Sequence, residues 1–381
     1  MSPTGTHMQR LSAFALAALL LSGSMAWGQV RYGQNARPRA VLSAEAQLHI
    51  PNRLATSLFQ GEQGKQRTEI HYDPATGLVT IKLLVQDKNG YFIPNIRRDN
   101  FVVYEDGARQ NTATVEIEHA AVSLGLLLEY GGRYPGLNRD LVLEVSRAGH
   151  QLLDILGRED RIAAWAYGDT VKQLADFSQS KETLDRTISS LKAPEVSETN
   201  LYDALIFALD RIRPVIGRKA IILISSGVDT FSKASYESAL NAARDGDTPI
   251  YIINLGPVLR ELAELHGTAG SLARIDWKDV EHKLLEIAKV SGGRLYSPGN
   301  TIDLSATYDD IMENLKVRYV ITYKSSNRAT SIAARTVRVE LVDPKDGKPL
   351  QIVDASGRPI RANVIVQGTY SPGGKAQPRT Q

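Results

Sequence analysis

Hydrophobic residues change their spacing along this chain, and each spacing predicts a different kind of structure. Between residues 68 and 118 apolar and polar residues alternate, as at Val79, Ile81 and Leu83, with the period of two that a half-buried strand has. The almost wholly apolar run 122–128 (VSLGLLL) then predicts a strand that is buried on both faces. An apolar stripe at helical spacing follows it. Strands and helices alternate from there on, which predicts a doubly wound, mostly parallel α/β sheet with helices on both faces.

The α/β block is expected to span residues 119–325. Its expected strands after the first are 161–167, 220–225, 250–255, 294–297 and 319–323, with a short hairpin strand within 171–177. Its expected helices are 138–156, 180–191, 200–212, 232–244, 280–290 and 303–316. Residues 257–279 are expected to form a longer connection with some helical character.

The segments on either side of this block return to the alternating pattern of β-structure. Residues 335–370 alternate like residues 68–118, so we expect the two segments to pair in one Ig-like β-sandwich into which the α/β block is inserted. A turn is expected at Asp106-Gly107, where the glycine accepts a positive φ. Residues 29–67 are polar and irregular, which indicates a leader or linker, and the tail 371–381 is expected to be disordered.

The first 28 residues have the pattern of a signal peptide. A single basic residue, Arg10, precedes the apolar run 11–21, and small residues allow cleavage after Ala26 or Gly28. The run is shorter than the about 20 residues of a membrane-spanning helix. We therefore expect a secreted or periplasmic protein that has no transmembrane span after cleavage.

Composition narrows the possible functions. The chain has 381 residues, enough for about two domains at roughly 150 residues each, and 45 basic against 42 acidic residues give a net charge of +3, too balanced for a nucleic-acid binder. The absence of cysteine excludes disulfides, thiolate metal sites and thiol catalysis. The seven histidines show no metal or triad spacing, and no nucleophile–base pair is evident, so the sequence does not indicate an enzyme.

Three sequence segments connect the α/β block to a known family. Residues 199–205 (TNLYDAL), 219–227 (KAIILISSG) and 287–294 (IAKVSGGR), together with the order of elements over 119–325, resemble a von Willebrand factor type A domain. The flanking phrase 102–107 (VVYEDG) resembles a bacterial exported branch of that family that is abundant in Acidobacteria.

The resemblance implies a metal-ion-dependent adhesion site at the carboxyl ends of the strands. The family pattern supplies Mg²⁺ with Asp-x-Ser-x-Ser after the first strand, a Thr from a second loop and an Asp after the fourth strand. The corresponding positions here are Glu129, Gly131, Arg133, Thr199 and Ser226, with Asp229 three residues beyond the last. Thr199 alone keeps the residue type of the family, so we expect these loops to form a degenerate site.

The charge at this site also opposes a metal. Arg133 adds a positive charge where a cation would bind, so we expect no cofactor, or at most weak Mg²⁺ binding by Thr199 and Glu129. Two interpretations of Arg133 remain open. Its guanidinium takes the place of the cation and pairs with Glu129, or the two residues form an exposed ion pair near a helix start that contributes little.

These expectations lead to an exported, non-enzymatic protein of the adhesion type. It would recognise a protein or cell-surface ligand through the loops at the top of the sheet. The alternative is a structural or assembly subunit of an envelope complex, which would use helix faces or strand edges and leave the degenerate site silent.

Overall fold

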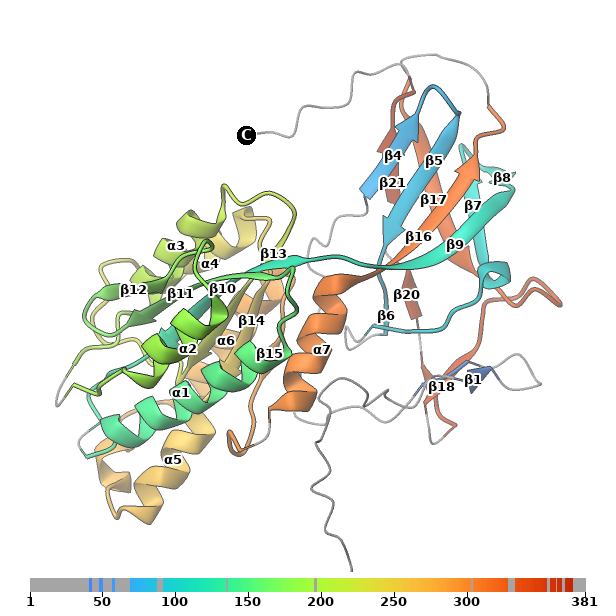
Figure 1. Cartoon of the computed structure of the whole chain (residues 1–381). Helices are drawn as coiled ribbons and strands as arrows, with labels where there is room; N and C mark the ends of the chain where they lie inside the picture. The colour runs from blue at the N-terminus through green and yellow to red at the C-terminus, as the bar shows by residue number, and fades with distance from the viewer. Residues whose placement is uncertain are drawn as a thin grey trace, which may run out of the picture. The chain divides into compact units, whose positions relative to one another are not determined.

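The computed structural model of the chain is shown in Figure 1. It describes residues 41–42, 48–50, 57–58, 69–87, 92–134, 136–194, 197–302, 304–327, 333–354, 357–360, 362–364 and 367–372. The predicted signal peptide 1–28, most of the predicted leader 29–67 and residues 373–381 of the predicted tail lie outside this description. Among the described residues, none of the helices combines the length and the apolar character needed to cross a membrane.

A seven-stranded sheet forms the centre of the α/β part. Its strands in spatial order are β12 (Val171–Ala175), β11 (Arg161–Tyr167), β10 (Val122–Glu129), β13 (Arg218–Ser225), β14 (Ile250–Asn254), β15 (Leu295–Tyr296) and β3 (Ser57–Leu58). The five inner strands run parallel, and both edge strands are antiparallel to their neighbours. The α/β character predicted from the sequence is confirmed, in a sheet of mixed direction.

Helices cover both faces of this sheet. The helices α1 (Asn138–Ile155), α2 (Lys181–Ser189), α5 (Gly256–Leu265) and α7 (Ser305–Lys316) share one hydrophobic cluster with the sheet. The helices α3 (Leu201–Ile212), α4 (Tyr236–Asp245) and α6 (Trp277–Ser291) share the cluster on the other face. Strand β10 serves both clusters, with Leu126 and Leu128 in the first and Leu127 in the second, which explains its uninterrupted apolar run.

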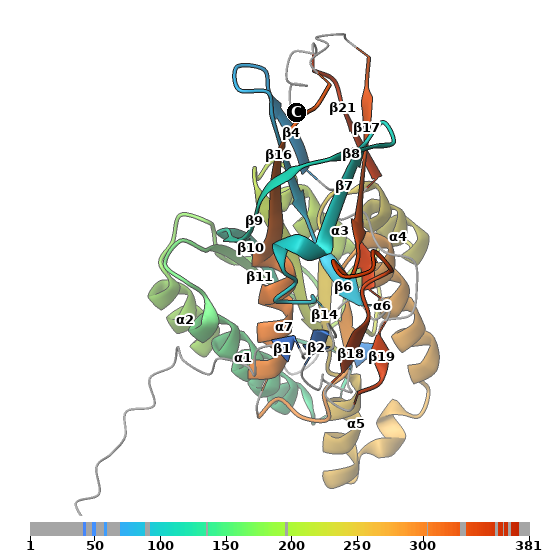
Figure 2. The same cartoon turned by 90° about the vertical axis from the view of Figure 1, so that its right-hand side faces the viewer.

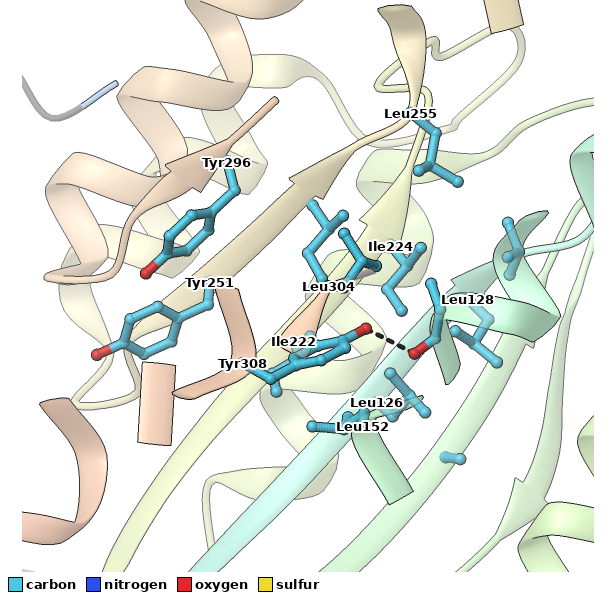
Figure 3. Packing of buried hydrophobic residues seen from close by; sticks show 14 of the residues in the cluster. Leu126, Leu128, Leu152, Ile222, Ile224, Tyr251, Leu255, Tyr296, Leu304 and Tyr308 are labelled. Atoms are coloured by element: carbon cyan, nitrogen blue, oxygen red, sulfur yellow. Dashed lines mark hydrogen bonds between the residues drawn. The ribbon is translucent and has the colours of Figure 1, made fainter. Parts of the chain in front are cut away.

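Figure 3 shows how the first cluster closes against the sheet. Leu126 and Ile222, from adjacent strands, lie near the ring of Tyr308 on α7. The Tyr308 hydroxyl donates a hydrogen bond of 2.6 Å to the backbone carbonyl of Ala148 on α1. This bond allows a buried phenol to pack in an otherwise apolar core, because its polar end has a partner.

Capping residues set where two of the helices begin and end. Helix α4 starts at Tyr236, later than the expected residue 232, because the Ser235 side chain accepts the backbone N–H of Ser238. Helix α6 starts earlier than the expected residue 280 because the Asp276 carboxylate accepts the backbone N–H groups of Lys278 and Asp279. It ends at Ser291 and is followed by the cap residue Gly292, which is left-handed at φ 84°.

The β-rich part contains two four-stranded sheets. One has the order β4 (Glu69–Asp73), β5 (Leu78–Leu83), β16 (Val317–Lys324), β9 (Thr112–His119); the other has the order β21 (Gln367–Tyr370), β17 (Arg335–Leu341), β7 (Phe101–Glu105), β8 (Ala108–Gln110). Their buried residues form one hydrophobic cluster, and both sheets can be followed in Figure 2. Strand β17 pairs antiparallel with β7, so residues of 335–370 and 68–118 lie in one sheet.

Smaller strand pairings complete the described β-structure. A third four-stranded sheet, made of short strands, contains β1 (Val41–Leu42), β2 (Leu48–Ile50), β18 (Ile352–Asp354) and β19 (Pro359–Ile360). Strand β6 (Val85–Asp87) pairs with β20 (Ala362–Val364). The turn expected at Asp106-Gly107 is confirmed, since both residues have positive φ and Glu105 pairs with Ala108.

Two predictions from the sequence are wrong, one about a strand and one about an irregular segment. The strand expected at 319–323 as the last of the α/β block is β16, which pairs antiparallel with β5 and β9 instead. Its burial alternates along its length, as in a sheet with one face on a core, whereas a central parallel strand would be buried throughout. The segment 29–67 is not wholly irregular either, because β3 pairs with β15 at the edge of the large sheet. Strands of two or three residues are too short to show a period.

Candidate functional site

The carboxyl ends of β10 and β13 bring the predicted site residues together. The two strands are parallel neighbours, with Leu128 opposite Ile224, so Glu129 ends one strand beside Ser225, which ends the other. This edge of an open α/β sheet is where ligands usually bind. The structure therefore places Glu129 and Ser226 side by side, as the resemblance to the family implies.

Glu129 is fully buried and is the acceptor at the centre of a hydrogen-bond network. The Ser225 hydroxyl donates to Oε2 at 2.7 Å, and the Ser226 backbone N–H donates to the same oxygen at 2.8 Å. The Ser226 hydroxyl donates to Oε1 at 2.9 Å, and the hydroxyl of Tyr167 donates to Oε2 at 3.2 Å. Burial raises the pKa of Glu129 above its ordinary value, although the serine and tyrosine hydrogen bonds oppose this rise.

Tyr134 closes the space in front of this carboxylate. Its hydroxyl lies 2.8 Å from the Ser226 hydroxyl and donates to Glu129 Oε1 at 3.3 Å. Burial and the nearby Glu129 hold the pKa of Tyr134 well above its usual value, so the phenol is neutral. The hydroxyl of Tyr134 thus faces Glu129 and Ser226, two of the positions at which the family pattern places metal ligands.

The two glycines of the first loop make room for this tyrosine. A Cβ atom added to Gly132 would lie 2.2 Å from Cε2 of the Tyr134 ring, and one added to Gly131 would lie 2.8 Å from Cβ of Ser197. Both distances are too short for any side chain. A serine at 131, as in the family pattern, therefore does not fit this loop unless its neighbours move.

Both interpretations of Arg133 are wrong. Its side chain is 67% exposed, and its Nε donates to Glu198 Oε1 at 2.7 Å. Glu129 has hydroxyl and backbone donors and lies buried in the sheet edge, so Arg133 neither pairs with it nor takes the place of a cation. The side chain of Arg133 points to solvent and that of Tyr134 points into the core. The spacing of residues in the sequence does not predict which of the two is buried.

Asp229 is directed to helix α3 and not into the cluster around Glu129. Its carboxylate accepts the backbone N–H of Tyr202 at 3.3 Å, in the first turn of α3, and the backbone N–H of Ser232 at 3.3 Å. It therefore does not replace the aspartate that the family pattern has at the position of Ser226. Satisfying N–H groups at the start of a helix is a common role of aspartate.

Glu198 and Thr230 are site residues that the sequence analysis missed. The Thr230 hydroxyl donates to Glu198 Oε2 at 2.6 Å and accepts the backbone N–H of Thr199 at 2.8 Å. With the Arg133 bond, these contacts join the loops after β10 and β13 to the loop before α3. Tyr134, Tyr167 and Ser225 were also missed as ligands of Glu129, because isolated tyrosines and serines carry no pattern.

The polar groups around Glu129 do not fit Mg²⁺. Mg²⁺ takes about six oxygen ligands in near-octahedral geometry at roughly 2.0–2.1 Å, whereas the oxygens of Glu129 and Ser226 are already bonded to each other and to Tyr134. The Tyr134 hydroxyl lies within hydrogen-bond distance of both residues. No group of three or more His, Cys, Asp or Glu residues able to hold a metal occurs in the described part of the chain.

Comparison with known proteins identifies the α/β part. Residues 139–297 match the family model of the von Willebrand factor type A domain, which includes Thr199 and Ser226 but begins after Glu129 and Tyr134. No curated protein matches the chain.

Among solved structures, the chain is similar to the vWF domain of the type V pili tip protein Mfa5 from Porphyromonas gingivalis, with 12% identity and a TM-score of 0.39 over 51% of this chain and 95% of that chain. It is also similar to the conserved hypothetical protein BatB from Bacteroides thetaiotaomicron, with 16% identity and a TM-score of 0.36 over 51% and 97% of the two chains. A third is proximal thread matrix protein 1 from the mussel byssus, with 13% identity and a TM-score of 0.39 over 56% and 51%. Residues 139–297 of this chain form a von Willebrand factor type A domain.

Proposed function

We propose that this chain is an exported, non-enzymatic binding protein of the adhesion type, which recognises a protein or cell-surface ligand through the loops at the carboxyl ends of β10 and β13. Type A domains are generally binding modules, which supports a role in recognition. The observation that carries the proposal is the arrangement of side chains at these loops. Exposed side chains form a rim, and the buried hydrogen-bond cluster around Glu129 holds the loops in place.

The rim has the chemistry of a contact surface. Phe231 is 73% exposed in the loop after β13, and Arg133 is 67% exposed in the loop after β10. We call Arg133, Glu198, Thr230 and Phe231 the top-loop surface. Large aromatic and arginine side chains are frequent at the centres of protein interfaces.

The loops beneath this surface are joined by several bonds. The backbone N–H of Thr230 donates to the Thr199 carbonyl at 2.9 Å, and Ser197 and Asn200 bond to Asp169 through its carboxylate and carbonyl. A surface that is ordered before binding loses less conformational entropy when the ligand arrives. This favours binding through rigid loops without a cation, since the oxygens around Glu129 are already occupied.

Export and the bacterial origin of the family branch are further parts of the proposal. The pattern of residues 1–28 supports a signal peptide and a secreted or periplasmic location, and the phrase 102–107 supports the bacterial exported branch abundant in Acidobacteria. The common core of the two four-stranded sheets supports an Ig-like β-sandwich beside the type A domain.

The alternative function, an assembly subunit of an envelope complex, is favoured by a different surface. Leu143, Leu265 and Ile302 are 55%, 75% and 74% exposed. Leu143 belongs to α1, and the residues next to the other two contact that helix. His266 pairs with Asp140 of α1 at 3.6 Å, and the Thr301 hydroxyl accepts a bond from Arg147 of α1 at 3.3 Å. We call these three apolar residues the α1-side surface. A contiguous patch of exposed apolar groups often marks a contact between proteins.

Site-specific photo-cross-linking in the native host separates the two functions. A photoreactive amino acid replaces Phe231 in one variant and Leu143 in a matched variant, because both side chains are large, apolar and exposed. Binding through the top loops predicts a specific cross-linked partner at position 231 and none at position 143. The reverse result would support the assembly subunit and overturn the proposed function.

A further inference from the structure

We propose that Tyr134 is an internal plug of the adhesion-site position, and that its hydroxyl takes the place that a divalent cation has in the family pattern. The chain would then keep the shape of the binding loops without any metal. This inference rests on the proposed placement of the degenerate site at Glu129, Thr199 and Ser226. It does not depend on which ligand the loops recognise.

The contacts of the hydroxyl support this assignment. It lies 2.8 Å from Ser226 Oγ and 3.3 Å from Glu129 Oε1. Glu129 ends β10 and Ser226 directly follows β13, and a shared cation would otherwise connect these two strand ends. A hydroxyl can both donate and accept, so one group can link a carboxylate with an alcohol.

The charge of the cluster agrees with a neutral occupant. A divalent cation needs several anionic ligands to offset the loss of its water, and of the two groups bonded to the Tyr134 hydroxyl one, Glu129, is a carboxylate. Ser226 stands where the family pattern has a second carboxylate. A neutral phenol needs no such compensation, since its single polar group is satisfied by hydrogen bonds.

The loop is shaped around the ring. Gly132 tolerates no Cβ, because that atom would lie 2.2 Å from the ring of Tyr134. The Leu137 backbone N–H donates to the Tyr134 carbonyl at 2.9 Å and closes the turn that directs the ring inward. The ring itself is 1% exposed and belongs to the hydrophobic cluster that also contains Leu137 and Leu141. Packing of the ring therefore fixes the position of the hydroxyl beside Glu129 and Ser226.

A cation titration of the full mature chain tests the plug. One variant combines Tyr134→Ser with Ser226→Asp, which removes the ring and restores the missing carboxylate. The matched control combines Arg133→Ser with Ser226→Asp, which restores the carboxylate and leaves the ring in place. Calorimetry with Mg²⁺ and with Mn²⁺ should show binding to the first variant at least about 10-fold tighter than to the control, and no binding to the unchanged chain.

Three results would overturn the inference. These are micromolar Mg²⁺ binding to the unchanged chain, equal binding to the two double variants, and absence of binding to both while circular dichroism shows that both are folded. The titration requires no ligand, so its failure leaves the proposed function standing, and a failed cross-linking experiment leaves the plug standing.

A second measurement covers the case in which the Tyr134→Ser variant does not fold. Nitration of the unchanged chain by tetranitromethane, followed by peptide mass spectrometry, reports how accessible each tyrosine is. Tyr134 should react at least about 10-fold more slowly than the half-buried Tyr202, because its ring is enclosed. Equal reaction of the two tyrosines would show that the ring leaves the site and would contradict the plug.

Discussion

Two buried glutamates, one in each part of the molecule, solve the same problem in different ways. Glu105 of the β-rich part accepts hydrogen bonds from Ser325 at 2.7 Å, from Tyr323 at 2.8 Å and from Tyr370 at 2.8 Å. The guanidinium of Arg335 adds a fourth at 3.0 Å. Glu129 of the α/β part has hydroxyls and one backbone N–H group as its partners among the described residues.

The two environments shift the pKa values in opposite directions. Burial is the largest influence on both carboxyls and raises both values. At Glu105 the hydrogen bonds from Ser325, from the tyrosines and from Arg335 outweigh burial, so the pKa is lowered. At Glu129 burial prevails and the pKa is raised. The balance between burial and hydrogen bonding thus favours the charged form of Glu105 and the neutral form of Glu129.

The comparison assigns different roles to the two clusters. An ion pair with three hydroxyl donors holds strands of the β-rich part together. The cluster around Glu129 lies at the edge of the sheet where ligands usually bind, but its polar groups bond to one another. Under the proposed function, recognition is therefore expected to come from the exposed rim residues.

The largest effect is expected from removing the cation of the first cluster. Arg335→Met leaves the Glu105 carboxylate buried without its charged partner, which should lower the free energy of unfolding by about 3–5 kcal/mol. Urea denaturation at neutral pH measures this. The double variant with Glu105→Gln should recover part of the loss, since it leaves no buried charge. A loss of less than about 1 kcal/mol for Arg335→Met would show that the guanidinium is dispensable and would break the comparison.

A second test uses pH, because the two glutamates should respond with opposite signs. The lowered pKa of Glu105 gives stability that is present above its ordinary value of 4.5 and is lost as the pH falls through the folded-state pKa. The raised pKa of Glu129 gives stability that is present below 4.5 and is lost as the pH rises through the folded-state pKa.

The matched variants for this test are Glu105→Gln and Glu129→Gln, measured by urea denaturation between acidic and neutral pH. Glu105→Gln should cost about 1.5–3 kcal/mol near neutral pH, and the cost should shrink as the solution is acidified. The cost of Glu129→Gln should instead shrink as the pH rises above 4.5. The same direction of change for both variants would contradict the assignment.

The smallest effect is expected in the loop after β10, where the buried Tyr134 follows the exposed Arg133. Tyr134→Phe keeps the ring and removes the hydroxyl that bonds to Ser226 and Glu129, so it should lower the free energy of unfolding by about 1 kcal/mol. Arg133→Ala removes an exposed ion pair with Glu198 and should leave the denaturation midpoint unchanged within error. Thermal and urea denaturation of the two variants side by side measure the difference, and an equal effect would show that the phenol hydroxyl is not part of a closed cluster.

The pattern of apolar residues predicted the inner strands of the α/β part, but not its edge strand β3 or the pairing of β16. Strand β10 is apolar throughout because both of its faces are covered, and α1 has its stripe because one face meets the sheet. The two-residue turn at Asp106-Gly107 followed from local backbone chemistry. These features depend on residues that are close together in the sequence, so they can be inferred without knowing the rest of the fold.

Other features depended on contacts between segments that are far apart in the sequence. Strand β16 pairs with β5 and β9 because one face of it is apolar and is buried in the core of the β-rich part. These partners lie more than 190 residues away along the chain. Arg133 turned to Glu198 and Tyr134 turned to Glu129 because packing of the ring beside Gly132 set the direction of the loop. Which partner a side chain meets is decided by the space and the charges that the folded chain places around it, and a pattern along the sequence contains neither.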